Sequence, residues 1–150
     1  MIIAIDSGPV RSAYVILDGR ASLEHGWTEN DALLAGAIAW MSATVGGKGV
    51  VERPRLYGKR AGSDIGDAIF WAGRFAELLG ASMTLDEIRV ALTTDRHGTK
   101  EDMSFAVARY FGKSTMADLT RRGGLCHKWT DHEKDALRLA VAYIKREDGK

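Results

Sequence analysis

Two short apolar runs, far apart in the chain, each end in an acidic residue. Residues 1–5 precede Asp6, and residues 49–51 precede Glu52. Runs this short, with turn-forming residues such as Gly8 and Pro9 close behind, are typical of buried strands. An acid at the end of a buried strand is partly shielded from water, so its charge needs a partner. The two runs therefore predict interior strands and a concentration of negative charge where those strands end.

The order of the predicted elements indicates an α/β fold. Residues 1–6, 12–17 and 21–27 are β-prone, and the tight-turn pair Asp18-Gly19 separates the last two, which predicts an antiparallel meander. Later segments alternate between helical and extended patterns, as in folds with crossover connections. The later predicted elements are a helix over 30–44 with Asn30 as its N-cap, a strand over 49–52, a helix over 63–80, a fifth short strand within 83–85 and 88–92, a helix over 100–111 and an irregular segment over 112–129.

The start of the last helix is the most clearly marked. Thr130 and Glu133 match a capping box, in which each side chain bonds the backbone amide of the other residue. Apolar residues at positions 137, 140, 141 and 144 supply the stripe that would be buried. His132 and Asp135 are three residues apart, so they share one face in the first turns of this helix.

Length and composition suit one globular domain over residues 1–150. Apolar residues make up 45% and charged residues 27% of the chain, both ordinary for a folded protein that buries a core. The only cysteine is Cys126, so no disulfide forms within the chain, which fits a reducing cytoplasm. No apolar run approaches the ~20 residues of a membrane span, and residues 1–6 are too few for the core of a signal peptide. We therefore expect a cytoplasmic protein without a membrane partner.

Local charge says more about a partner than the net charge of +1. One segment of eight residues contains no acid and four bases: Arg53, Arg55, Lys59 and Arg60. A second basic region is opposed only by Asp118, and it contains Arg109, Lys113, Arg121, Arg122 and Lys128. Such clusters suit a phosphate backbone, although a solvated basic face explains the charge pattern alone equally well.

Four residues form the candidate catalytic site: Asp6, Glu52, His132 and Asp135. Hydrolysis of a phosphodiester by two divalent ions needs ligands on separate rigid elements that hold the ions roughly 3.5–4 Å apart. Strand ends and the first turns of a helix would supply such ligands. Each position also has a structural explanation: Asp6 could begin a turn, Glu52 could pair with Arg53 or Arg55, and acids in a first turn suit the helix dipole. Their joint occurrence in this order favours a two-metal nuclease.

Three motifs together resemble the RuvC family of Holliday junction resolvases, which belongs to the RNase H-like superfamily. The motifs are Ile-Ala-Ile-Asp-Ser-Gly at Asp6, Val-Val-Glu-Arg-Pro at Glu52, and His-Glu-Lys-Asp-Ala-Leu from His132. The resemblance covers about residues 1–146. It implies an RNase H-like fold, with a five-stranded mixed sheet (an antiparallel 1-2-3 meander plus parallel strands) flanked by helices.

The resemblance also implies an activity and its partners. Members of the family are homodimers that bind four-way DNA junctions and cut two strands of like polarity with Mg²⁺ or Mn²⁺. Carried over by motif, Asp6, Glu52, His132 and Asp135 are the catalytic residues and the ligands of two metal ions. The expected DNA-binding residues, with Tyr57 as a stacking residue, are Arg53, Arg55, Tyr57, Lys59, Arg60 and Lys100. The helix over 63–80, with Phe70 and Trp71, is the expected dimer interface, and the host is expected to be a bacterial or phage-infected cell.

Two neighbouring residues, Asp131 and His132, are alternative candidates for the fourth residue of the site. Many family members have Asp where His132 stands, although some carry His. Asp131 lies four residues before Asp135 and could also face the site. An imidazole ligand would shift the metal preference toward Mn²⁺, or His132 could act as a general base instead. We favour His132 because its spacing to Asp135 matches the family pattern.

Three other classes of protein compete with the resolvase interpretation. A nuclease of the same superfamily that acts on flaps, other branched DNA or RNA–DNA hybrids would need the same four residues. A sugar-kinase or actin-like ATPase also opens with a strand and an Asp-x-Gly turn, but it needs two such domains, more than 150 residues hold. A nucleic-acid-binding module without catalysis would not need Glu52 and Asp135 together.

Overall fold

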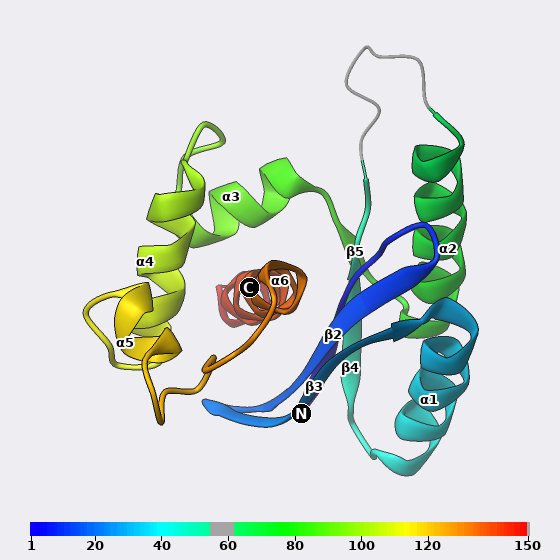
Figure 1. The fold of residues 1–150 in the computed structure, drawn as a ribbon, viewed down its shortest axis with the longest axis horizontal. Coiled ribbons are helices and arrows are strands. Elements are labelled where there is room, and N and C mark those ends of the chain that lie inside the picture. The colour runs from blue at the N-terminus through cyan, green and yellow to red at the C-terminus, as the bar shows by residue number, and fades with distance from the viewer. Residues whose placement is uncertain (55–61, 150) are drawn as a thin grey trace.

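A five-stranded mixed sheet forms the centre of the computed structural model, which describes residues 1–54 and 62–149 (Figure 1). The strands are β1 (Ile2–Asp6), β2 (Arg11–Asp18), β3 (Ala21–Glu29), β4 (Lys48–Glu52) and β5 (Ser82–Met83). Their order across the sheet is β3-β2-β1-β4-β5. The pairs β1–β2 and β2–β3 are antiparallel, whereas β1–β4 and β4–β5 are parallel. The predicted meander and the predicted mixed sheet are both confirmed.

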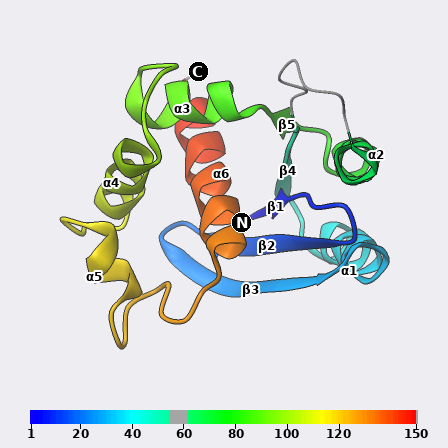
Figure 2. The ribbon, with the colours of Figure 1, turned by 45° about the horizontal axis from the view of Figure 1, so that its top comes forward.

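Helices cover both faces of the sheet (Figures 1 and 2). They are α1 (Asn30–Ala43), α2 (Ser63–Leu79), α3 (Leu85–Thr93), α4 (Lys100–Tyr110), α5 (Met116–Thr120) and α6 (Asp131–Asp148). On one face lie α1 and α2, and on the other lies α6, with α3 and α4 packed against its far side. Within the described residues, no helix is both long enough and apolar enough to cross a membrane.

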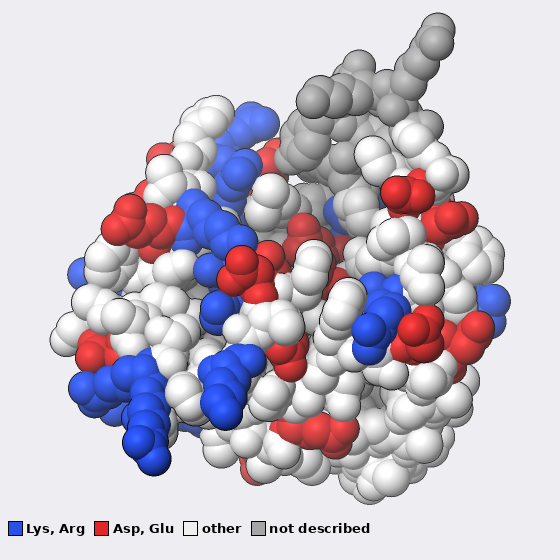
Figure 3. Space-filling view, in the orientation of Figure 1, with Lys and Arg blue, Asp and Glu red and all other residues white. Residues whose placement is uncertain are grey.

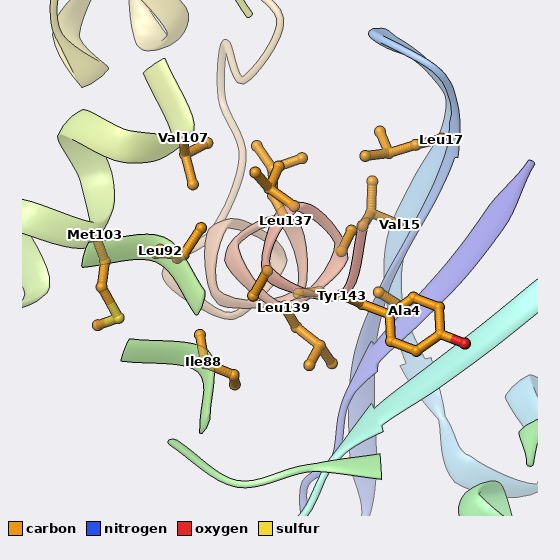
Figure 4. Packing of buried hydrophobic residues seen from close by; sticks show 14 of the residues in the cluster. Ala4, Val15, Leu17, Ile88, Leu92, Met103, Val107, Leu137, Leu139 and Tyr143 are labelled. Carbon is orange, nitrogen blue, oxygen red and sulfur yellow. The ribbon is translucent and has the colours of Figure 1, made fainter. Parts of the chain in front are cut away.

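The alternation of side chains along the strands decides which residues face α6. Ile3, Ile5 and Val51 belong to the core under α1 and α2, whereas Ala4 and Val50 belong to the core around α6. Figure 4 shows Ala4, with Val15 and Leu17 of β2, beside Leu137 and Leu139 of α6. Because successive side chains of a strand point to opposite faces, Asp6 and Glu52 project on the same side as Ala4 and Val50.

Helix α6 lies in the middle of the larger core and starts where the sequence predicts. Thr130 Oγ1 accepts a hydrogen bond from the Glu133 amide at 3.2 Å, and Glu133 Oε2 accepts one from the Thr130 amide at 2.6 Å. Glu133 Oε1 also lies 2.6 Å from His25 Nδ1 on β3. These contacts fix the first turn of α6 against the sheet, and with it the positions of His132 and Asp135.

Two segment predictions are wrong, each because a capping interaction between side chains was overlooked. Residues 85–93 form helix α3 rather than a strand, because Thr84 and Glu87 make a capping box and Ile88 and Leu92 lie on its buried side. The fifth strand is therefore limited to Ser82–Met83. Within the segment expected to be irregular, Thr115 and Asp118 cap the short helix α5.

Asn30 is the first helical residue of α1 and not its N-cap, which is Glu29. The Asn30 side chain is buried, where its Oδ1 accepts a hydrogen bond from Ser12 Oγ at 2.5 Å and its Nδ2 donates to the Gly8 carbonyl at 3.0 Å. These bonds tie α1 to the turn between β1 and β2, directly after Asp6.

Candidate active site

Asp6 and Glu52 are neighbours at the ends of two adjacent parallel strands. The register of β1 and β4 pairs Ile5 with Val51, so the next residue along each strand is one of the two acids. Neighbouring strands lie roughly 4.8 Å apart, which brings the two side chains together on the face of α6. The Ser7 hydroxyl donates to the Glu52 carbonyl at 3.2 Å and joins the two strand ends.

The turn that follows Asp6 is tight enough to require glycine. A Cβ atom at Gly8 would lie 2.3 Å from the Arg11 carbonyl oxygen, which no side chain tolerates. The Gly8 amide donates to Ser12 Oγ at 3.2 Å, and its carbonyl accepts from Asn30. The turn is thus held on both sides, and it keeps the Asp6 side chain at the strand end.

Helix α6 adds the other two predicted residues to the same pocket. His132 Nδ1 lies 3.1 Å from Asp6 Oδ2. Asp6, Glu52, His132 and Asp135 all line one pocket of about 320 Å³, together with Lys100, Arg89 and Arg138 and the apolar side chains of Leu85, Ile88 and Met103. In the space-filling view, acidic side chains gather in a hollow near the centre of the face, and basic side chains flank it on the side of α3 and α4 (Figure 3). The structure therefore brings together all four residues that the sequence singled out.

Two cations hold the carboxylate of Asp135. Lys100 Nζ lies 3.4 Å from Asp135 Oδ2, and the Arg138 guanidinium contacts Asp135 Oδ1. Arg138 is 6% exposed, and it also donates to Ser104 Oγ at 3.0 Å. Sequence reasoning missed Arg138 because it lies among the apolar residues of α6. Its spacing of three residues from Asp135 was the available signal.

The pocket raises the pKa values of its two strand-end acids. Burial, and then the negative charges of Asp6 and Asp135, raise the pKa of Glu52 to about 7. Burial raises the pKa of Asp6 to about 6, with Asp135 adding to the increase, while the hydrogen bond from His132 opposes it. Both acids would therefore gain from a bound cation, because a positive charge would offset the repulsion between them.

The donor set of the pocket fits a hard divalent cation. Carboxylate oxygens are the ligands that Mg²⁺ prefers, and an added imidazole is compatible with Mn²⁺. Among residues 1–54 and 62–149, no three His, Cys, Asp or Glu side chains already converge closely enough to hold an ion. Asp135 faces Arg138 and Lys100 instead, so metal binding requires this carboxylate to exchange part of its contact with the two cations.

The two candidates for the fourth residue of the site, Asp131 and His132, differ in position. Asp131 lies outside the residues that line the pocket, its side chain is 81% exposed, and its carboxylate pairs with Lys134 at 3.2 Å. The ring of His132 lines the pocket and contacts Asp6. The geometry thus favours His132.

We predict that His132→Ala lowers the rate of phosphodiester cleavage by roughly 10²-fold, as expected for loss of a metal ligand or a proton-transfer group. Asp131→Ala is expected to stay within about threefold of wild type, because an exposed ion pair contributes little. Single-turnover rates of both variants on the same DNA substrate would test this. A larger loss in Asp131→Ala than in His132→Ala would reverse the assignment.

The residues expected to bind DNA are only partly placed by the structure. Lys100 lines the pocket, and Arg53 lies exposed directly after Glu52. Arg53 and Glu52 form no ion pair with each other among the described residues, and Arg55, the other ion-pair partner considered for Glu52, lies outside them. Arg55, Tyr57, Lys59 and Arg60 lie outside the described residues.

Part of the second basic region lines a separate pocket beside α5, which Arg20 joins from the turn between β2 and β3. Arg20, Lys113, Arg121 and Arg122 line it together with one acid, Asp118. Asp118 pairs with Arg121 at 3.8 Å. In Figure 3 basic side chains also gather over α5, on the same face of the molecule as the acidic hollow. An extended polyanion could therefore contact both regions from one side.

The structure resembles that of RuvC from Thermus thermophilus, with a TM-score of 0.67 over 99% of this chain and 95% of RuvC, at 15% sequence identity. T. thermophilus RuvC in complex with a Holliday junction substrate gives a TM-score of 0.66 over 97% and 93% of the two chains, at 17% identity. The chain has the RuvC fold. At the level of sequence, no family model and no curated protein matches it. The RuvC fold is the RNase H-like fold that the three motifs implied, so the predicted fold class is confirmed.

Proposed function

We propose that this protein is a divalent-metal-dependent endonuclease that resolves four-way DNA junctions, with residues 1–150 acting as one nuclease domain. The observation that carries the proposal is the convergence of Asp6, Glu52 and Asp135 in one pocket, at the strand ends of a RuvC fold. The solved complex of T. thermophilus RuvC with a Holliday junction substrate supports the four-way junction as the substrate class.

Asp6, Glu52, His132 and Asp135 are the residues that would hold two Mg²⁺ or Mn²⁺ ions. When bound, such ions activate the attacking water and stabilise the leaving oxygen of the phosphodiester. Burial, and after it the charges of neighbouring carboxylates, raise the pKa values of Asp6 and Glu52, which supports cation binding because a bound positive charge would stabilise both ionised acids.

The other residues of the pocket have distinct roles in this proposal. Arg138 is buried and anchored to Ser104, so it positions Asp135 without reaching the solvent. The Lys100 side chain is 60% exposed, so its ammonium can contact a phosphate oxygen while remaining near Asp135. His132 holds the Asp6 carboxylate through the contact of 3.1 Å. Lys100 and Arg53, with Arg55, Tyr57, Lys59 and Arg60 beyond the described residues, are the proposed DNA contacts.

A homodimer is part of the proposal, because two symmetric cuts across a junction need two active sites. Helix α2 supports it with exposed apolar side chains at helical spacing: Ile65, Ile69 and Phe70 are 38%, 36% and 54% exposed. Exposed apolar residues grouped on one helix are typical of interaction surfaces.

We predict that the wild-type protein elutes in gel filtration with twice the chain mass of 16.4 kDa, and that Phe70→Glu shifts it to the mass of one chain. Val90→Glu is the matched control, since Val90 is a similarly exposed apolar residue on α3. Elution of the wild-type protein as a single chain at micromolar concentration would count against the dimer.

A panel of labelled substrates tests the proposed function. The panel comprises a four-way junction, a flap, a linear duplex and an RNA–DNA hybrid, each incubated with Mg²⁺ and with Mn²⁺. We expect preferential cleavage of the four-way junction, by paired cuts in strands of like polarity. Exclusive cleavage of the hybrid, or preferential cleavage of the flap, would show that this nucleic acid, and not the four-way junction, is the substrate.

A further inference from the structure

An exposed tryptophan lies at the edge of the acidic pocket. Trp27 is on β3, where it pairs with Ala13 of β2, and 44% of its surface is exposed. Its indole is nearly parallel to the ring of His132, with 6.2 Å between the ring centroids and an interplanar angle of 12°. A large aromatic ring is thus presented to solvent beside a side chain that touches Asp6.

Arg11 holds this indole in place. The guanidinium carbon of Arg11 lies 4.1 Å from the centroid of the Trp27 ring, which is a cation–π contact. The same guanidinium donates to the Trp27 carbonyl at 2.8 Å and pairs with Glu29 at 3.5 Å. The position of the ring is therefore set before any ligand arrives.

The indole lines a second pocket that adjoins the first. This pocket has a volume of about 360 Å³, and its walls are Asp6, the turn over residues 7–10, Arg11, Trp27, His132 and, from α2, Ala68. Asp6 and His132 line both pockets. A phosphate bound at Asp6 would therefore have its own nucleoside within reach of the second pocket.

We propose that this second pocket is a nucleobase subsite, in which Trp27 stacks with the base that flanks the scissile phosphate. The inference rests on the proposed function, because it takes the acidic pocket as the place where the phosphate is cut. Stacking on an aromatic face accepts any of the four bases, and it suits a base that has lost a neighbour where strands exchange at a branch. Trp27 thereby selects branched over continuous duplex DNA and fixes the sugar beside the scissile bond.

Photo-crosslinking tests the subsite without relying on a variant of Trp27. The positions at which the wild-type protein cuts a four-way junction are mapped first. The uncut junction, with one 5-iododeoxyuridine at a chosen position, is then bound to Asp6→Asn protein and irradiated, and crosslinked peptides are identified by mass spectrometry. We expect a crosslink to Trp27 only when the modified base flanks the cut. Crosslinks confined to other residues, or no crosslink at that position despite binding, would overturn the subsite.

Kinetics supply the second test. Trp27→Leu is expected to lower the single-turnover rate on the four-way junction about 10- to 30-fold, with Trp27→Phe retaining most of the rate because it keeps an aromatic face. Leu23→Ala is the matched control, since Leu23 is another exposed apolar residue of β3. A rate for Trp27→Leu equal to that of wild type would overturn the subsite but not the proposed function. A wild-type protein that cuts no junction would overturn both.

Discussion

Asp6→Asn is expected to lower the rate of junction cleavage by about 10³-fold, while four-way junction binding stays equal or becomes tighter. A loss of this size is typical when a group that stabilises the transition state is removed. Asp6 ends β1 beside Glu52, contacts His132, and lies at the meeting point of both pockets. Binding survives because the change removes a negative charge from a place where phosphate is expected. Single-turnover cleavage and a gel-shift titration in Ca²⁺ measure the two quantities separately.

The neighbouring acid Asp131 offers a matched control for this prediction. Asp131→Asn also removes one negative charge near the start of α6, but its carboxylate is exposed and paired with Lys134. We expect its cleavage rate to remain close to that of wild type. Cleavage by Asp6→Asn at the wild-type rate would rule out Asp6 as a metal-site residue, and loss of junction binding in a folded Asp6→Asn protein would contradict the proposed placement of the phosphate.

Glu52→Gln is expected to stabilise the metal-free protein at pH 8, by on the order of 2 kcal/mol in the free energy of unfolding. Burial, and then Asp6 and Asp135, raise the pKa of Glu52 from 4.5 to about 7. Between these pH values the folded protein holds a proton that the unfolded chain has released, so the free energy of unfolding falls as pH rises. Glutamine keeps the shape of the side chain and removes the charge, so the variant escapes this loss.

Urea denaturation in EDTA, at pH 5 and pH 8, measures the effect. The difference between Glu52→Gln and wild type should be small at pH 5, where the wild-type carboxylate is still largely protonated in the folded state, and largest at pH 8. Glu77→Gln, an exposed acid on α2, should show no such difference. Added Mn²⁺ should stabilise the wild-type protein more than Glu52→Gln. A variant that is less stable than wild type by the same amount at both pH values would contradict the electrostatic origin of the effect.

The parts of the fold that were predicted correctly have strong local signals. Residues 1–5 and 49–51 are short apolar runs, and the strands they predict lie in the interior of the sheet. The capping box of Thr130 and Glu133 predicts the start of α6 to within a few residues. Helix α3 was missed because only two buried residues, Ile88 and Leu92, mark its helical periodicity. In a segment of nine residues, the cap at Thr84 is the one signal that favours a helix over a strand.

The residues of the candidate site that lie at the end of a strand or at the start of a helix could be predicted from the sequence. Asp6 and Glu52 end strands and His132 begins a helix, so their position in each element already indicates where they meet. Arg138 and Trp27 carry no such signal. Arg138 is buried within α6 and pairs there with Asp135. Trp27 belongs to the site only because β3 lies beside the start of α6, where the indole stacks with His132.

We expect Asp6, Glu52, His132 and Asp135 to hold the metal ions with which the protein cuts the junction. Anomalous scattering from Mn²⁺ can locate these ions in crystals of the wild-type protein bound to a four-way junction with uncleavable linkages at the mapped cut sites. We predict anomalous peaks among these four side chains, with the Asp135 carboxylate partly released from Arg138 and Lys100. Well-ordered DNA with manganese bound elsewhere, and none between Asp6 and Glu52, would rule out this metal site.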